Sequence, residues 1–140
     1  MVAAASIFGT APLIPQIVRM FFCSHTRKTK PELVNEWKEK FLSVPFQSVL
    51  HTAAALISRD SVVNRLGEIE VPALIVVGEM DEPLPPAYSR EIVGALVNAS
   101  LVEVKKAGHM SNLEQPELFN AALLAFLRQF ESSKVLGSPK

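Results

Sequence analysis

The chain has 140 residues, of which 49% are hydrophobic and 20% are charged, a composition typical of a globular protein of one domain at most. Fourteen Lys and Arg residues balance fourteen Asp and Glu residues, so the composition offers no basic surplus for a nucleic-acid partner. The single cysteine excludes an internal disulfide framework.

The N-terminal segment Met1–Ile14 is apolar and is expected to be irregular. No Lys or Arg precedes its apolar residues, and Gly9 and Pro12 interrupt them, so the segment does not have the pattern of a signal peptide. No apolar run approaches the roughly 20 residues of a membrane span. We therefore predict a cytoplasmic protein without a membrane partner.

Helical patterns follow in the first half of the chain. Pro15–Phe22 is predicted to be a short helix, and the polar, basic stretch Cys23–Lys30 is predicted to be a connector. Pro31–Leu42 and Pro45–Ser58 repeat their apolar residues at helical spacing, which predicts two amphipathic helices. In the second of these we expect the apolar side chains, including Ile57, to face inward.

The second half has the pattern of an α/β unit. Ala73–Val77 and Leu101–Val104 are short runs rich in branched aliphatic residues and are predicted to be buried strands. Ala87–Val97 lies between them and has helical spacing. A strand, a helix and a second strand in this order predict two parallel strands joined by a right-handed crossover.

Two candidate catalytic residues come directly after the predicted strands. Asp81 follows the first strand and His109 follows the second, and open α/β sheets place their chemistry at the carboxyl ends of parallel strands. Gly108 would let the loop turn sharply before the histidine. A histidine held there could exchange a proton with a nucleophile while a carboxylate orients its ring.

Two longer motifs surround these residues, and through them the chain resembles the C-terminal part of α/β-hydrolase fold proteins. They read V-P-A-L-I-V-V-G-E-M-D and A-G-H-M-S-N-L-E-Q-P-E-L-F-N-A-A-L-L-A-F-L. The resemblance covers Asp60–Phe130 well and is strongest to the esterase and lactonase branch that includes 3-oxoadipate enol-lactonases.

The resemblance implies a fold, a division of the chain and a reaction. Residues 1–66 would form a helical cap, for which the alternative is an ordinary helical layer packed on a sheet, and residues 67–132 a core segment with the acid and the histidine. The Ser, Gly and Pro residues near the C-terminus separately predict a flexible tail over residues 133–140. In the family, the chain order is Ser, acid, His, which assigns Asp81 as the acid and His109 as the base. The implied substrate is a small ester or lactone, and neither a cofactor nor a metal is implied. Epoxides and haloalkanes are substrates of the same fold, so the substrate stays open.

The sequence lacks a recognisable nucleophile for this triad. A nucleophile elbow needs Gly-x-Ser-x-Gly, and the 140 residues do not contain that motif. Cys23 precedes Asp81 and His109 in the required order, but it lacks the flanking glycines, and we interpret it as a small buried residue. We therefore expect the 140 residues alone to be inactive and the missing N-terminal half to come from an upstream part of the same protein or from another chain. The alternative is a non-catalytic binding or interaction protein that keeps part of the fold.

Overall fold

The computed structural model describes residues 9–135, with side chains through residue 130. A short 3₁₀ helix over Ala11–Leu13 opens the described part. Four α-helices come next: α2 (Ile14–Phe21), α3 (Ser24–Thr29), α4 (Pro31–Leu42) and α5 (Phe46–Ser58). A second 3₁₀ helix over Val63–Glu68 leads into the sheet.

The predicted strand–helix–strand unit is confirmed. Strand β1 (Ala73–Gly78) pairs in parallel with β2 (Ala99–Val104), and α6 (Pro86–Ala95) connects them. The register pairs each residue of β1 with the residue 26 positions later, from Ala73 with Ala99 to Gly78 with Val104. Both strands therefore end at the same edge of the sheet, which brings the loops that follow them together.

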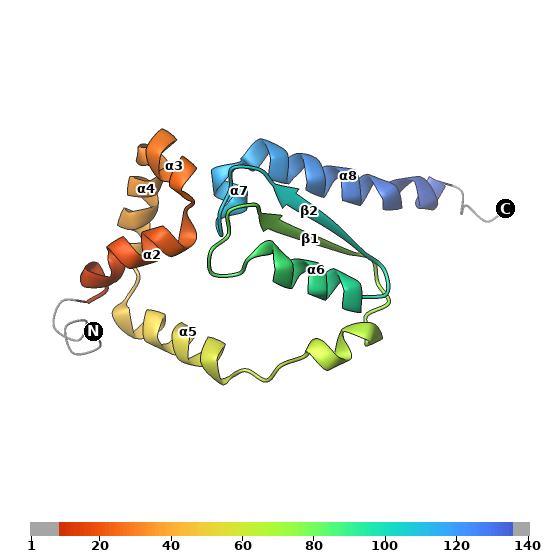
Figure 1. Cartoon of the computed structure of the whole chain (residues 1–140), viewed down its shortest axis with the longest axis horizontal. Coiled ribbons are helices and arrows are strands. Elements are labelled where there is room, and N and C mark those ends of the chain that lie inside the picture. Colours follow the sequence, from red (N-terminus) through yellow and green to blue (C-terminus); the bar gives the residue numbers. More distant parts are fainter. Residues whose placement is uncertain (1–8, 136–140) are drawn as a thin grey trace.

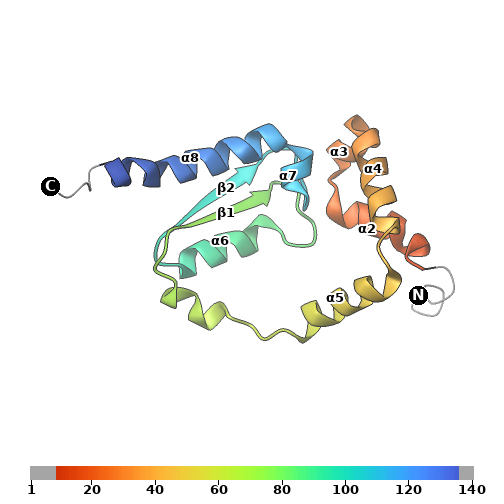
Figure 2. The same cartoon turned by 180° about the vertical axis from the view of Figure 1, so that it is seen from behind.

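The sheet lies between two helices. Helix α6 covers one face, and α8 (Pro116–Val135) covers the other after the single turn of α7 (Ser111–Glu114) (Figure 1). Helices α2, α3 and α4 form a separate group beside α7, at the carboxyl end of the strands, and the view from behind shows the same arrangement (Figure 2). The chain thus has an α/β arrangement of two parallel strands and a crossover helix, with helices before the strands.

The main apolar cluster lies among the helices rather than under the sheet. Its buried members come from α2, the turn after it, and α4: Ile14, Val18, Phe22 and Val34. Trp37 packs against this cluster and stacks on Phe41, with ring centroids 5.0 Å apart. These contacts explain why α2 and α4 form, because short helices depend on burying an apolar face.

Three sequence predictions about this region need correction. The segment Cys23–Lys30 is not only a connector, because its middle forms α3, whose Thr26 is fully buried. Helix α5 forms as predicted but buries none of its residues, and Ile57 is 86% exposed. The strands are fully buried only near their carboxyl ends, because within residues 9–135 the sheet has two strands and each keeps an unpaired edge.

The predicted segment boundaries at residues 66 and 132 stay predictions. Helix α8 continues to Val135, three residues into the segment predicted as a flexible tail. Residues 136–140 and residues 1–8, which include most of the segment predicted to be irregular, lie outside the described residues.

Candidate active site

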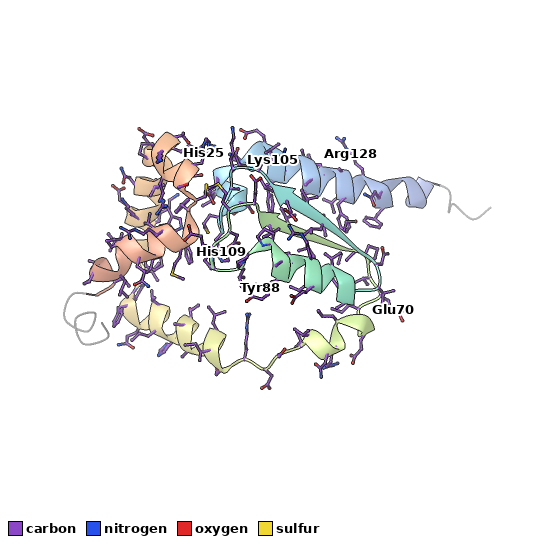
Figure 3. The ribbon with its side chains drawn as sticks, in the orientation of Figure 1. His25, Glu70, Tyr88, Lys105, His109 and Arg128 are labelled. Atoms are coloured by element: carbon purple, nitrogen blue, oxygen red, sulfur yellow. The ribbon has the colours of Figure 1, made fainter. Side chains whose placement is uncertain are left out.

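The structure brings the two predicted catalytic residues into contact. Asp81 follows β1 and His109 follows β2, and the Asp81 Oδ2 atom lies 2.9 Å from His109 Nδ1 although 28 positions separate them in the sequence. The Asp81 side chain is only 6% exposed, whereas that of His109 is 30% exposed. Figure 3 shows His109 at the carboxyl end of the sheet, on the side of α6 that carries Tyr88 and away from Glu70. The buried acid and the accessible imidazole have the geometry of an orienting carboxylate and a base.

The Asp81 carboxylate is held by both of its oxygen atoms. While Oδ2 contacts the histidine, Oδ1 accepts a hydrogen bond of 3.0 Å from the backbone N–H of Leu84. The backbone N–H of Asp81 in turn donates to the Gly78 carbonyl at the end of β1, at 3.1 Å. These two local contacts hold Asp81 in place independently of its contact with His109.

Gly78 allows the two strand-end loops to approach each other. A Cβ atom at this position would lie 2.1 Å from the Gly108 carbonyl oxygen and 2.5 Å from that of Ala107. Both of these are backbone atoms, which cannot rotate away as a flexible side chain could. A side chain at residue 78 would therefore push the loop of His109 away from the loop of Asp81.

Gly108 has a related role, which differs from the sharp turn that the sequence suggested. Its φ is not in the left-handed region, where the described residues place only Gly9 and Lys106. A Cβ atom on Gly108 would instead lie 2.8 Å from the backbone nitrogen of Cys23. The glycine is needed because the segment between α2 and α3 packs directly against the histidine loop.

Glu114 connects these two segments, and sequence reasoning missed it. Its side chain is fully buried. Atom Oε1 accepts a hydrogen bond of 2.7 Å from the Gly108 N–H, and Oε2 accepts one of 2.9 Å from the Cys23 N–H. One carboxylate therefore joins the residue before the base to a residue of the helical segment. The second motif does contain this glutamate, directly before Gln115 and Pro116. A single acidic residue at that place is, however, typical of a helix start, so it did not indicate a buried role.

Further contacts join the helical segment before the strands to the residues around His109. The Met110 N–H donates to the Phe21 carbonyl at 3.0 Å, and Lys30 Nζ donates to the Glu114 carbonyl at 2.6 Å. The ring of Phe21 lies against the ring of His109, with centroids 5.5 Å apart. The imidazole is thus bounded by the acid on one side and by an aromatic ring from α2 on another.

Cys23 has the buried position that the sequence suggested. Its Sγ atom lies 3.4 Å from Thr26 Oγ1 and 3.4 Å from the Lys106 carbonyl, and it accepts from the Thr26 N–H at the start of α3. Between residues 9 and 135, no hydrogen bond joins Cys23 to His109. The thiol thus caps a helix and is not paired with the base.

Neither a metal-binding cluster nor a single membrane-spanning helix is found among the described residues. No group of three or more His, Cys, Asp and Glu side chains in residues 9–135 is placed to hold a metal ion. Across the same residues, no single helix is both long and apolar enough to cross a membrane. Helices α4 and α5 meet the criteria of length and composition only as a pair, and they are bent by 97°.

A parallel strand pair with an acid and a histidine in contact at its carboxyl end is the arrangement expected of an α/β hydrolase. The comparisons with known proteins agree with this class. The family described as TAP-like protein, an α/β-hydrolase family, matches residues 50–134, which is more than half of the chain. The chain therefore belongs to the α/β-hydrolase family.

Individual relatives include esterases and lactonases. The chain is 27% identical over 122 residues to 3-oxoadipate enol-lactonase 2 of Acinetobacter baylyi, a match that covers 87% of this chain and 45% of the relative. Its structure is similar to that of a thermophilic esterase from Thermogutta terrifontis, with 25% identity and a TM-score of 0.83 over 86% of this chain and 44% of the esterase. For an enol-lactonase from Burkholderia xenovorans the identity is 25% and the TM-score 0.82, over 90% of this chain and 48% of that enzyme.

The chain thus spans about half the length of the relatives that it matches. The similarity confirms the resemblance to the esterase and lactonase branch. The catalytic roles of Asp81 and His109 and the activity of a whole protein go beyond this similarity.

Proposed function

We propose that these 140 residues carry the acid and the base of a hydrolase that cleaves a small ester or lactone. The observation that carries the proposal is the contact of 2.9 Å between Asp81 Oδ2 and His109 Nδ1 at the carboxyl end of two parallel strands. The esterases and lactonases among the relatives support the substrate class.

The chemistry follows from the hydrogen bond. An ionised carboxylate can only accept, so Nδ1 of His109 carries the shared proton and the lone pair of the neutral ring lies on Nε2. Nε2 can then take a proton from the hydroxyl of a nucleophile as that oxygen attacks the carbonyl carbon. The same proton passes to the leaving oxygen, and a water molecule later cleaves the acyl-enzyme by the same route. Asp81 stabilises the imidazolium that forms in each step.

The nucleophile of this reaction lies outside the 140 residues, since they contain no nucleophile elbow. We propose that it belongs to an N-terminal half with the remaining strands, in the same polypeptide or in a partner chain. Within the described residues β1 pairs only with β2, so an edge of β1 is open to a further strand. With a single cysteine in the sequence, the reducing cytoplasm is the proposed location.

The test uses the protein assembled with its nucleophile-bearing half. Hydrolysis of p-nitrophenyl acetate and of a simple lactone is measured for the parent protein, His109→Ala and Asp81→Asn. Asp81→Asn should lower kcat by roughly 10⁴-fold and His109→Ala by roughly 10⁶-fold, as expected for triad members. His51→Ala is the matched control, because His51 is an exposed histidine on α5. Hydrolysis that survives His109→Ala would refute the proposed role.

A non-catalytic binding protein is the second candidate. Two observations favour it: exposed apolar side chains before β1, at Val62, Val63 and Val71, and an edge of β1 that pairs with no strand among the described residues. Such a surface suits a protein partner. Tight binding of a partner with no hydrolysis in the assembled protein, and with no effect of His109→Ala, would favour this candidate over the enzyme.

A further inference from the structure

A cavity of about 350 Å³ lies between α2, the end of α4 and α5. Phe21 and Met20 of α2 form one wall, and Val49 and Ala53 of α5 form the opposite wall. The volume lies at the small end of the roughly 300–1,000 Å³ that ligand sites occupy. The cavity is open to solvent, since Met20, Val44 and Leu56 of its lining are exposed. Its volume is large enough for a short chain or a single ring.

The lining of the cavity is apolar and uncharged. Of the ten described residues that line it, only Ser48 and Thr52 are polar, and the Thr52 hydroxyl already donates to the Ser48 carbonyl of its own helix at 2.9 Å. These described lining residues include no Lys, Arg or His. A carboxylate that entered would lose its hydration without gaining a cation, whereas an alkyl group would leave water for apolar walls.

The cavity also adjoins the candidate base. Phe21 lines the cavity, and its ring lies 5.5 Å from the ring of His109, centroid to centroid. A group seated in the cavity is therefore one aromatic ring away from the imidazole. This places an apolar subsite beside the point where the proposed function puts the scissile bond.

We propose that this cavity binds the uncharged, apolar acyl or alcohol group of the substrate. The proposal rests on the proposed function and deepens it: the substrate is a neutral ester or lactone with a short aliphatic or single-ring substituent. Substrates that carry a free carboxylate at this end are disfavoured, because the lining has no positive charge.

The chain has its own reporter for this site. Trp37 is its single tryptophan, and its ring contacts two lining residues, Phe41 with centroids 5.0 Å apart and Phe21 with centroids 5.4 Å apart. A ligand that enters should therefore change the tryptophan fluorescence. The probes are 1-hexanol, hexanoate and adipate, which compare similar chain lengths with zero, one and two carboxylates.

We expect 1-hexanol to change the emission of Trp37 saturably, and hexanoate to bind at least about tenfold more weakly. Ala53→Phe fills the cavity and should weaken the binding of 1-hexanol by at least about tenfold. Ala54→Phe is the matched control on the next position of α5, because Ala54 is exposed and outside the lining. Ser48→Lys adds a cation to the lining and should reverse the preference, so that hexanoate binds better than 1-hexanol.

The proposal is overturned if hexanoate or adipate binds the unmodified chain as well as 1-hexanol does. It is equally overturned if Ala53→Phe and Ala54→Phe have the same affinity for 1-hexanol, or if Ser48→Lys leaves the preference unchanged. None of these measurements needs a nucleophile. A failed hydrolysis test with intact binding of 1-hexanol would thus count against the proposed reaction and not against the apolar site.

Discussion

Replacing Glu114 by alanine should be among the most damaging single changes in this protein. The carboxylate is fully buried and accepts two short hydrogen bonds, from the N–H groups of Gly108 and Cys23. A hydrogen bond to a charged group contributes about 1.5–3 kcal/mol, and a buried donor left without a partner carries a penalty of its own. Two such bonds give about 3–6 kcal/mol, from which the relieved burial of the carboxylate is subtracted. We expect Glu114→Ala to lower the free energy of unfolding by about 3–5 kcal/mol.

The assay is urea denaturation of the full chain, followed by the fluorescence of Trp37 and by far-ultraviolet circular dichroism. Native-state amide exchange measures the two bonds directly, and the amides of Gly108 and Cys23 should lose their protection together. Glu114→Gln keeps the shape but can accept only one of the two bonds, because its amide nitrogen is a donor. Its loss of stability should lie below that of Glu114→Ala.

Glu117→Ala is the matched control, since Glu117 is an exposed glutamate on the first turn of α8. It should change the free energy of unfolding by no more than about 0.5 kcal/mol. The reasoning is refuted if Glu114→Ala is as stable as Glu117→Ala, or if the amides of Gly108 and Cys23 keep their protection in Glu114→Ala.

Three further predictions concern the loops and α5. Gly78→Ala should destabilise the chain by at least about 3 kcal/mol, because its Cβ atom would meet two backbone carbonyl oxygens. Chemical denaturation measures this change, and a loss of stability below about 1 kcal/mol would contradict the prediction. Lys106 has a φ of 56°, so Lys106→Gly should gain up to about 1 kcal/mol by relieving that strain, whereas Lys105→Gly should gain nothing. Equal melting temperatures for these two variants would contradict the strain. The amides of α5 should exchange faster than those of α2, because α5 buries no residue while α2 buries Ile14 and Val18; mass spectrometry of peptic fragments compares the two helices, and slower exchange in α5 would be the contrary result.

The strands, the crossover and the acid–histidine pair could be predicted because their signals are local. Branched aliphatic runs mark β1 and β2, and parallel pairing then places whatever follows each strand at one edge of the sheet. Asp81 and His109 needed only this rule and the two motifs around them. The contact between their side chains follows from the register and not from any long-range feature of the sequence.

The role of Glu114 could not be predicted in that way. Its partners are Gly108, six positions away, and Cys23, 91 positions away, and both bonds are made by backbone N–H groups. Backbone donors have no sequence signature, so a buried glutamate looks the same as a solvated one. Helix α3 was missed for a similar reason: its sequence is polar, and it depends on the cap from Cys23 and on the burial of Thr26.

Helix α5 shows a different limit of prediction from sequence, because its helix was predicted correctly but its packing was not. Its apolar spacing correctly predicted a helix, but the prediction that Ile57 faces a core was wrong, because nothing in the described part of the chain covers that side. An apolar pattern indicates which side chains are stabilised by leaving water, but it does not indicate which residues they pack against.

The contacts around His109 divide the helical segment into two unequal parts. Helices α2 and α4 share the apolar cluster. The Phe21 carbonyl, the Cys23 N–H and Lys30 Nζ bond to Met110 or to Glu114 of α7. Moving this group would break those bonds and shift the ring that lies on the imidazole. Helix α5 buries no residue, and it forms the opposite wall of the apolar cavity. We therefore expect the width of the cavity to change through α5 while Asp81, His109 and Phe21 keep their contacts.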